Sequence, residues 1–442
     1  MNPRQAPDQA DRLTSRRSAG LAGDLCVPGD KSISHRALIL AAMAPGESRI
    51  TGLSRGIDVQ RTIEAVRALG ARVEQRSEDE WIVHGGAWRS PEAPLDCGNS
   101  GTTARLLIGA VAGRGIRAGF TGDSSLCRRP MSRITTPLRE MGARIEGGAT
   151  LPISIGGGAL GAISLVNRFG SAQLKSAILL AGLGAAGPVE IVEPVPSRDH
   201  TERMLPLFGV PIGLEETDQG LRISLGERRR LRAARVEVPG DPSAAAFPLV
   251  AALITPGSEL IVRNVLVNPL RTGLFRTLRE MGADLRFSGE RSLGGESAAD
   301  ISASYSPLHG VTVPADRAPT MIDEYPILAV AAAFARGETV MHGLGELRHK
   351  ESDRLAAIVA GLGACGVAAR IDGDSLTVSG GTIMGGAEVA SHGDHRIAMS
   401  FLVLGLASSR PVGVDQADMI ATSFPRFADT MRSIGARIGP SA

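Results

Sequence analysis

Aromatic side chains are scarce in this chain of 442 residues, where Phe, Trp and Tyr together make up only 3%. Proteins that bind single-stranded nucleic acid stack the bases on aromatic rings, so this scarcity argues against such a ligand. The formal net charge at pH 7 is +2, far from the excess of Lys and Arg that nucleic-acid-binding proteins carry. Any site for an anion must therefore be local, and we expect no nucleic-acid partner.

Cysteine is also rare, and the four residues show no CxxC spacing. Four cysteines are too few for a disulfide scaffold, which fits a reducing compartment. No uninterrupted apolar run reaches the roughly 18 residues of a membrane span, and residues 1–20 lack the apolar segment of a signal peptide. We therefore expect a cytoplasmic protein that does not enter a membrane, with a disordered tail over residues 1–20.

Residues 27–36 combine a chain break with the start of a helix, because a Pro-Gly pair is followed by a long apolar run. Asp30 or Ser32 can cap this helix, whose first turns then carry Lys31 and Arg36. Unpaired backbone N–H groups and the helix dipole favour an anion at that end. An ordinary capped helix with solvated charges explains the segment as well, so this stretch alone does not indicate a function.

Residues 238–243 have the sequence Val-Pro-Gly-Asp-Pro-Ser, which repeats the Val-Pro-Gly-Asp-Lys-Ser of residues 27–32 with Pro in place of Lys. An Ala-rich apolar run again follows. A second sequence motif also recurs. In each copy a glycine ends an amphipathic helical pattern and precedes a predicted strand, at Gly70, Gly142, Gly209, Gly282, Gly366 and Gly435. The spacing of about 70 residues indicates an internal repeat of six copies. The chain therefore reads as two similar halves of three repeats each.

A parallel series of small-residue segments is apolar on nearly every face, which predicts buried helices over residues 32–44, 101–113, 171–184, 243–255, 324–336 and 394–408. Strands fill the spaces between the helices, so we predict an α/β (α+β) protein of two similar domains. The segment before Pro28 is too short for a repeat and is expected to pair with the second half. One domain would then span residues 30–240, and the other residues 21–29 with 241–442.

Several of these helices open with groups that suit an anion, at residues 98–102, 170–175 and 393–396. If the repeats are equivalent, these helix starts converge on one face of each domain and line a cleft between the domains. Each loop alone is a weak signal, because glycine-containing helix starts are common and mostly structural. Their recurrence in register favours a binding site.

In residues 348–355, Lys350 and Arg354 would lie at i,i+4 on a helix, where like charges repel unless an anion lies between them. Glu351 beside them could transfer a proton. A solvated charged face explains the same spacing and is favoured when the spacing is taken alone. Asp323 stands at a predicted helix start, where capping competes with a catalytic role.

A metal site is not expected. His392, Asp394 and His395 lie close together in the chain, but no third and fourth ligand follows at a recognisable spacing.

Read together, five motifs resemble the EPSP synthase (3-phosphoshikimate 1-carboxyvinyltransferase) family: residues 28–32, 98–102, 129–131, 350–354 and 394–396. The similarity implies two domains of three βαβαββ-type units each. It also implies transfer of the enolpyruvyl group of phosphoenolpyruvate (PEP) to the 5-hydroxyl of shikimate 3-phosphate, with release of phosphate, in the chorismate route to aromatic amino acids. The family resemblance implies a monomer and no cofactor.

The resemblance also assigns site residues by their positions in these motifs. Shikimate 3-phosphate is expected against Lys31, Ser32, Arg36, Ser171, Ala172, Gln173, Arg198, Asp323 and Lys350. PEP is expected against Lys31, Gly101, Arg129, Gln173, Arg354 and Arg396. Asp323 would take the proton of the attacking hydroxyl, and Glu351, with Lys31, would deliver one to the methylene carbon.

Two positions depart from the family pattern. Many members carry a second Ser where Ala172 stands, and a Lys where Thr422 stands, so one cation for PEP is missing here. The chain resembles the subgroup that includes glyphosate-tolerant members, but it keeps Gly101 where those have Ala. We therefore expect glyphosate to inhibit it, because no methyl group narrows that pocket.

Two other functions are compatible with parts of this pattern. The related UDP-N-acetylglucosamine enolpyruvyl transferases usually carry a reactive Cys a few residues before the Arg that matches Arg129, whereas here Ser124 stands five residues before it and Cys127 two. A repeat protein that binds anions without catalysis is the alternative from another class. Turnover of the two substrates distinguishes it from an enzyme.

Overall fold

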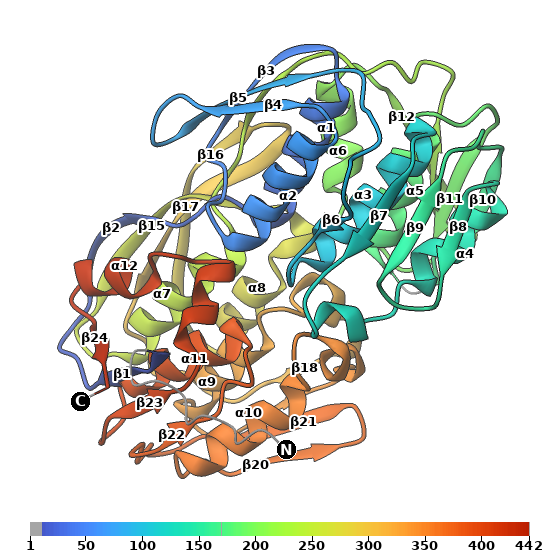
Figure 1. Cartoon of the computed structure of the whole chain (residues 1–442). Coiled ribbons are helices and arrows are strands. Elements are labelled where there is room, and N and C mark those ends of the chain that lie inside the picture. Colours follow the sequence, from blue (N-terminus) through green and yellow to red (C-terminus); the bar gives the residue numbers. More distant parts are fainter. Residues whose placement is uncertain (1–10, 169, 442) are drawn as a thin grey trace, which may run out of the picture. The chain divides into compact units, whose positions relative to one another are not determined.

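A computed structural model of the chain describes residues 11–168 and 170–441 (Figure 1). Six helices in this part of the chain are buried along most of their length: α1 (Lys31–Met43), α3 (Gly101–Arg114), α5 (Ala172–Gly182), α7 (Pro242–Ile254), α9 (Tyr325–Ala333) and α11 (His395–Gly405). Their Ala, Leu, Ile and Val side chains leave no polar face for water. The predicted series of buried helices is confirmed, with ends that shift by a few residues.

Another set of helices buries one face only: α2 (Ile57–Ala68), α4 (Ser132–Glu140), α6 (His200–Leu207), α8 (Gly273–Glu280), α10 (Arg354–Ala364) and α12 (Phe427–Ser433). Two residues after each of them comes the repeated glycine, with φ between 81° and 110°. A side chain is strained at such φ values, which explains why glycine recurs there. Short 3₁₀ helices connect further elements: η2 (Leu126–Arg128), η3 (Pro269–Arg271), η4 (Ala315–Thr320), η5 (Gly345–His349) and η6 (Ala417–Thr422).

The strands of the described residues form six sheets of four strands each, and every sheet has the same plan. An edge strand runs parallel to its neighbour, and that neighbour pairs antiparallel with the third strand. Three sheets, in spatial order, are β14 (Arg235–Glu237), β3 (Gly46–Thr51), β5 (Glu80–Gly85) and β4 (Arg72–Gln75); β6 (Leu95–Asp96), β7 (Ala118–Thr121), β9 (Ile153–Gly156) and β8 (Arg144–Gly147); and β10 (Ile163–Val166), β11 (Val189–Glu193), β13 (Gly220–Leu225) and β12 (Ile212–Thr217).

The other three sheets follow the same plan with strands from both ends of the chain. They are β16 (Asp284–Leu293), β17 (Glu296–Ser304), β15 (Glu259–Leu266) and β2 (Ala22–Cys26); β18 (Thr312–Val313), β19 (Glu338–Met341), β21 (Ser375–Ser379) and β20 (Ala369–Asp372); and β22 (Glu388–Val389), β23 (Val412–Val414), β1 (Leu13–Arg16) and β24 (Arg437–Pro440).

Three repeats are continuous βαβαββ units, such as the run β6, α3, β7, α4, β8, β9. The other three are completed by a strand from elsewhere in the chain, namely β14, β2 or β1. Figure 1 shows the blue strand β2 beside β15, its parallel partner. The segment before Pro28 thus pairs with the second half, as predicted, and the predicted α/β class of repeated βαβαββ units is confirmed.

The chain divides into two compact lobes. The N-lobe comprises Gly29–Pro239 and the short segment Ser292–Glu296, and the C-lobe comprises the described residues before Gly29, Gly240–Arg291 and the described residues from Ser297 onward. The assignment of residues 30–240, and of 21–29 with 241–442, as two enolpyruvyl-transferase-type domains stays a prediction.

The predicted disordered tail over residues 1–20 is wrong for its second half. Leu13–Arg16 form β1, which pairs with β23 and β24, and the buried Ser15 hydroxyl donates to the Val412 carbonyl oxygen at 3.3 Å. A run of four residues with one apolar side chain gives no local signal for a strand, because its partners lie some 400 residues away in the sequence. Residues 1–10 lie outside the described residues.

The two copies of the Pro-Gly-Asp string each start a buried helix. The Asp30 carboxylate accepts a hydrogen bond from the Ile33 backbone N–H at 2.8 Å and caps α1. The Asp241 carboxylate accepts from the Ser243 backbone N–H at 2.8 Å and caps α7. Of the two candidate caps for α1, the structure therefore uses Asp30, which leaves Lys31 as the first helical residue.

Helices α3 and α5 approach each other along glycines. A Cβ atom added to Gly109 would lie 2.2 Å from the Ala177 carbonyl oxygen, and one added to Gly113 would lie 2.6 Å from the Ala181 carbonyl oxygen. Backbone atoms cannot move aside as a flexible side chain can, so these positions admit no side chain. The close packing fixes the beginnings of α3 and α5 relative to each other.

We expect Gly109→Ala to lower the free energy of unfolding by about 2 kcal/mol or more, because overpacking outweighs the gain in helix propensity. Urea unfolding followed by circular dichroism measures this. The matched control is Gly363→Ala on the exposed side of α10, where an added Cβ meets nothing within 4 Å. There the substitution should raise the free energy of unfolding by about 0.5–1 kcal/mol; equal effects at both positions would contradict the packing argument.

Candidate active site

The N-lobe brings its predicted site residues to the beginnings of α1, α3 and α5. Arg105 Nη1 on α3 donates to Gln173 Oε1 on α5 at 3.0 Å, and Gln173 Nε2 donates to Thr102 Oγ1 at 3.0 Å. Arg36 on α1 donates to Ser176 on α5 at 2.7 Å. We refer to the following residues as the N-lobe cluster: Lys31, Ser32, Arg36, Gly101, Arg129, Ser171, Ala172, Gln173 and Arg198.

Lys31 is held at the start of α1 by a carboxylate of α2. Its Nζ atom lies 2.9 Å from Asp58 Oδ2, and the Lys31 side chain is 17% exposed. The Asp58 backbone carbonyl accepts a hydrogen bond from Thr103 on α3 at 3.3 Å. Three helices thus fix the position of this cation while part of it stays accessible.

Of the three neighbouring arginines Arg128, Arg129 and Arg133, Arg129 is held by hydrogen bonds within the N-lobe cluster. Its Nη2 atom donates to Asn99 Oδ1 at 2.6 Å and to Ser125 Oγ at 3.2 Å. Arg128 and Arg133 are exposed. A Cβ atom added to Gly101 would lie 3.6 Å from Arg129 Nη1, which places this guanidinium beside the first residue of α3.

Helices α5 and α6 supply the remaining members of the N-lobe cluster. Ser171 Oγ accepts from the Leu174 backbone N–H at 3.3 Å and caps α5, so Ala172 and Gln173 occupy its first turn. Arg198 is partly exposed and lies two residues before the start of α6. Its charge acts on Arg36: burial, above all, lowers the pKa of Arg36 to about 10, and the like charge of Arg198 adds to this against the opposing effect of Glu202.

The C-lobe gathers its predicted residues around one carboxylate. Lys350 Nζ and Arg354 Nη1 both lie 3.2 Å from Asp323 Oδ1. Arg396 Nη1 donates to the Asp323 backbone oxygen at 3.1 Å. We refer to Asp323, Lys350, Glu351, Arg354 and Arg396 as the C-lobe cluster.

The predicted helical spacing of Lys350 and Arg354 is wrong. Lys350 follows η5, and α10 begins only at Arg354, where the Asp353 carboxylate accepts from the Ala356 backbone N–H at 3.1 Å and caps the helix. The two cations meet because both reach Asp323. The anion that lies between these two like charges is the carboxylate of Asp323, a residue of the chain itself.

Arg354 is the most enclosed cation of the C-lobe cluster, with a side chain 1% exposed. Its guanidinium pairs with Asp394 at 2.7 Å and also with Asp323 and Glu351. Burial by itself lowers the pKa of Arg354, but the charges of Asp394, Glu351 and Asp323 outweigh burial and hold the pKa above its ordinary range. Glu351 and Asp323 pair with a buried cation, so they do not form the solvated charged face that the spacing alone favoured.

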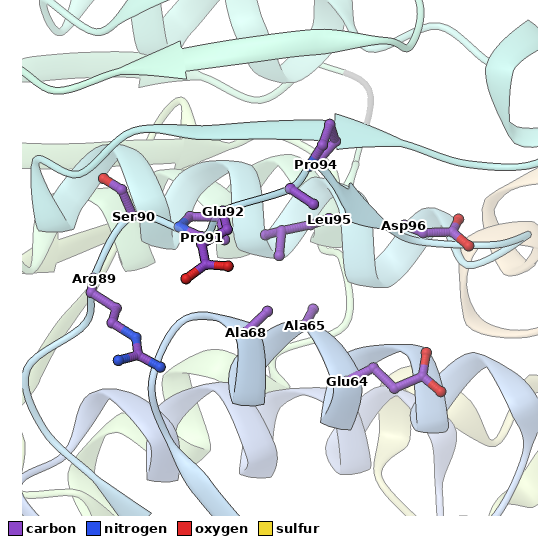
Figure 2. Close-up of a pocket in the computed structure, with 11 residues that line it drawn as sticks. Glu64, Ala65, Ala68, Arg89, Ser90, Pro91, Glu92, Pro94, Leu95 and Asp96 are labelled. Atoms are coloured by element: carbon purple, nitrogen blue, oxygen red, sulfur yellow. The ribbon is translucent and has the colours of Figure 1, made fainter.

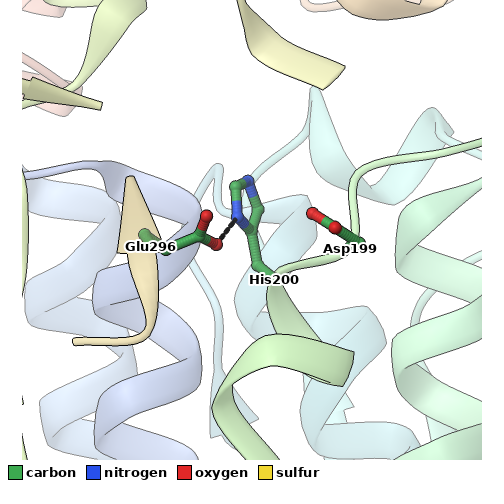
Figure 3. A group of neighbouring side chains, drawn as sticks. All are labelled: Asp199, His200 and Glu296. Atoms are coloured by element: carbon green, nitrogen blue, oxygen red, sulfur yellow. Dashed lines mark hydrogen bonds and ion pairs between the residues drawn. The ribbon is translucent and has the colours of Figure 1, made fainter. Parts of the chain in front are cut away.

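One group of described side chains has the composition of a metal site. One ligand atom from each of Asp199, His200 and Glu296 lies within 4.8 Å of the others. Figure 3 shows the His200 ring between the two carboxylates, with Nδ1 2.6 Å from Glu296 Oε1. Arg203 Nε lies 2.7 Å from Asp199 Oδ2 and 3.5 Å from Glu296 Oε2. This arginine already offsets the charge of both carboxylates, so we interpret the group as an ion-pair cluster.

A cavity of about 510 Å³ lies elsewhere in the N-lobe (Figure 2). Residues 89–96 form one wall, and Glu64, Ala65 and Ala68 of α2 form the other. None of the predicted site residues lines it. This cavity is therefore separate from the N-lobe cluster.

Several residues that hold the predicted site residues in place could not be recognised as such from the sequence around them. Asp58 holds Lys31, Ser176 and Thr201 hold Arg36, and Asn99 holds Arg129. Asn99 lies inside a recognised motif and could have been assigned from it. The others are single polar residues on helices, and only the packing of α1 against α2, α5 and α6 shows their role.

Comparison with known proteins identifies the family. The sequence profile of the family EPSP synthase (3-phosphoshikimate 1-carboxyvinyltransferase) matches residues 16–431. A 3-phosphoshikimate 1-carboxyvinyltransferase of Chelativorans sp. is 55% identical over 435 residues, which are 96% of this chain and 97% of the relative. That of Phenylobacterium zucineum is 53% identical over 434 residues, 97% of this chain and 96% of the relative. This chain belongs to the EPSP synthase family.

Solved structures agree with this assignment. EPSP synthase from Acinetobacter baumannii matches with a TM-score of 0.87 and 41% identity, over 98% of this chain and all of that chain. The enolpyruvyl transferase NikO from Streptomyces tendae matches with a TM-score of 0.77 over 97% of this chain and 98% of that one, and at 19% identity this likeness shows the fold alone. The predicted family, fold class and carboxyvinyl transfer are confirmed. No helix in the described part of the chain is long and apolar enough to cross a bilayer.

His35 lies between Ser34 and Arg36 on α1, and its ring is completely buried. Its Nδ1 atom lies 2.7 Å from Thr62 Oγ1. Burial, together with the charges of Lys31 and Arg36, lowers the pKa of His35 well below its ordinary value of 6.5. The folded protein therefore keeps this ring neutral at pH values where the unfolded chain protonates it.

We expect this histidine to make the protein less stable in mild acid. Its contribution is fully present above pH 6.5 and is lost as the pH falls from there toward the folded pKa, by at most about 1.4 kcal/mol per pH unit. His35→Asn should remove this part of the pH dependence in urea unfolding, because an amide keeps a bond to Thr62 and does not titrate. His84→Asn, at a partly exposed strand position, should leave the slope as in the parent; the same slope in H35N would exclude His35 as its source.

Proposed function

We propose that this chain transfers the enolpyruvyl group of PEP to the 5-hydroxyl of shikimate 3-phosphate through the residues of the two clusters. The observation that carries the residue assignment is that six of the predicted cations are held in place by partners from other elements: Lys31, Arg36, Arg129, Lys350, Arg354 and Arg396. Shikimate 3-phosphate and PEP each carry a phosphate and a carboxylate, and such anions need fixed cations and N–H groups. Ordinary solvated charges would not be restrained in this way.

In the N-lobe cluster, Lys31, Ser32, Arg36 and Arg198 would bind shikimate 3-phosphate together with the first turn of α5. That turn contributes Ser171, Ala172 and Gln173. Lys31, Gly101, Arg129 and Gln173 would contact PEP. The free N–H groups at the starts of α3 and α5 add to the positive potential there.

In the C-lobe cluster, Asp323 and Lys350 would contact shikimate 3-phosphate, and Arg354 and Arg396 would contact PEP. Asp323 would accept the proton of the attacking hydroxyl, and the two cations on its Oδ1 atom support this role because they fix the carboxylate in one orientation. Glu351, with Lys31, would deliver a proton to the methylene carbon. The resulting tetrahedral intermediate would then lose phosphate.

Position 422 carries a threonine where many family members have a lysine, so the expected PEP site has one cation fewer. The Thr422 hydroxyl is buried, donates to the Met419 carbonyl at 2.7 Å and lies 3.2 Å from His395 Nδ1, next to Arg396. It adds a polar group to this neighbourhood but no charge. Arg129, Arg354 and Arg396 would therefore bind PEP without a further lysine at this position.

We also propose a cytoplasmic monomer. Cys97, Cys127 and Cys365 are free thiols, which suits a reducing compartment. Light scattering of the purified protein tests the monomer.

The first test is turnover. Purified protein mixed with both substrates should release inorganic phosphate, and Lys31→Ala should reduce the rate at least about 100-fold, since Lys31 would serve both substrates and proton delivery. The control is Arg117→Ala, an exposed N-lobe cation outside the cluster, with the parent rate expected. Near-normal turnover in K31A would refute the role of Lys31. Binding of shikimate 3-phosphate without phosphate release would favour the anion-binding repeat protein.

Glyphosate should inhibit the parent protein, and Gly101→Ala should weaken that inhibition about 10-fold or more. The added methyl group would lie 2.6 Å from Arg105 Nη1, so it must displace a side chain next to Arg129. Phosphate release at increasing glyphosate concentrations measures the effect. Gly148→Ala, where an added Cβ meets nothing within 4 Å, is the control. A parent enzyme indifferent to millimolar glyphosate would contradict the prediction.

A further inference from the structure

Arg36 is a buried cation without a carboxylate partner among the described residues. It is 3% exposed, and its three hydrogen bonds go to uncharged groups. Nε donates to Thr201 Oγ1 at 2.8 Å, Nη2 donates to Ser176 Oγ at 2.7 Å, and Nη1 donates to the Ser32 carbonyl at 2.8 Å. A charge removed from water and left without a counterion favours an anionic ligand.

The two hydroxyls around Arg36 form a chain with one possible direction. A guanidinium can only donate, so both hydroxyls accept from it and must pass their own protons elsewhere. Thr201 Oγ1 donates to Ser176 Oγ at 2.7 Å, and Ser176 Oγ donates to the Ala172 carbonyl at 2.6 Å. Three bonds use three of the five N–H groups of Arg36, which leaves two for a ligand.

The residues next to these hydroxyls lock their helices together. Lys175 of α5, beside Ser176, lies 2.7 Å from Glu202 Oε1 of α6, beside Thr201. Lys175 also pairs with Glu193 Oε2 at 2.6 Å, and all three side chains are at most 3% exposed. The hydroxyl pair therefore stands on a rigid base, and it holds the guanidinium at a fixed angle.

We propose that Ser176 and Thr201 are positioning residues for shikimate 3-phosphate, which orient Arg36 so that its two remaining N–H groups face an anionic oxygen of this substrate. The inference rests on the proposed function and extends it to two residues outside the family motifs. Neither hydroxyl touches the substrate in this proposal. Their effect is on the free energy of binding one substrate.

The test is a pair of variants that each remove one hydroxyl. Thr201→Val keeps the shape of the side chain, and Ser176→Ala removes the acceptor for Nη2. Each should raise KM for shikimate 3-phosphate about 10-fold, as expected for the loss of a hydrogen bond to a charged group. KM for PEP should stay within about two-fold of the parent value, because the PEP contacts are unchanged. The double variant should cost less than the product of the single effects, since both hydroxyls belong to one chain of bonds.

Two controls separate positioning from general destabilisation. Thr201→Ser keeps the hydroxyl and should keep the parent KM. Thr135→Val removes a buried threonine hydroxyl of α4 that accepts from Arg139 at 3.4 Å, and it should leave both KM values unchanged. Thermal melting of every variant shows whether it is folded.

Titration calorimetry of shikimate 3-phosphate alone distinguishes the two proposals. If the parent binds this substrate but releases no phosphate from the pair, the proposed function fails, while weaker binding by T201V and S176A still supports the positioning role. If both folded variants bind shikimate 3-phosphate like the parent, or if KM rises equally for both substrates, the positioning role is wrong. The positioning role also requires that T201S bind shikimate 3-phosphate as tightly as the parent, whereas T201V binds it more weakly.

Discussion

Burying helices whose first turns carry charge is the constraint on which the rest of this structure depends. A charge cannot be enclosed without hydrogen bonds or an opposite charge, so Arg36 in α1 and Arg354 at the start of α10 both draw partners from neighbouring elements. Arg354 has three carboxylates, and Arg36 has two hydroxyls and a carbonyl. The partners that satisfy burial also fix the direction of each guanidinium, so the contacts that stabilise the fold would also orient these cations for the proposed substrates.

The two clusters meet this constraint differently. In the C-lobe cluster, carboxylates of the chain pair with Arg354, and two of them, Asp323 and Glu351, are the groups proposed to transfer protons. In the N-lobe cluster, no carboxylate of the described residues lies within ion-pair distance of Arg36, and burial above all lowers the pKa of its guanidinium to about 10. An arginine with such a pKa is still charged at neutral pH. The C-lobe cluster therefore combines cations with carboxylates of the chain, whereas the N-lobe cluster holds one buried guanidinium by uncharged groups alone.

Local features of the sequence predicted much of the fold. The small-residue runs predicted the buried helices, the repeated glycines predicted where the amphipathic helices end, and the Pro-Gly pair followed by polar residues predicted a cap at Asp30 or Ser32, of which the structure uses Asp30. Partners that are distant in the sequence were out of reach, because no local pattern shows that β1 lies between β23 and β24 or that Asp58 meets Lys31. The spacing of Lys350 and Arg354 misled for the same reason: a helix was inferred from i,i+4, whereas Asp323, some 30 residues earlier, unites the two cations.

The cations differ in their exposure to water, so dissolved salt should affect them differently. Mobile ions screen charges that water reaches, over a distance of roughly 8 Å at physiological ionic strength, and screen enclosed charges far less. Lys31 and Lys350 are 17% and 27% exposed, whereas Arg354 is 1% exposed. Rising ionic strength would therefore weaken attraction at the two lysines first, while the electrostatic field of the buried arginine persists.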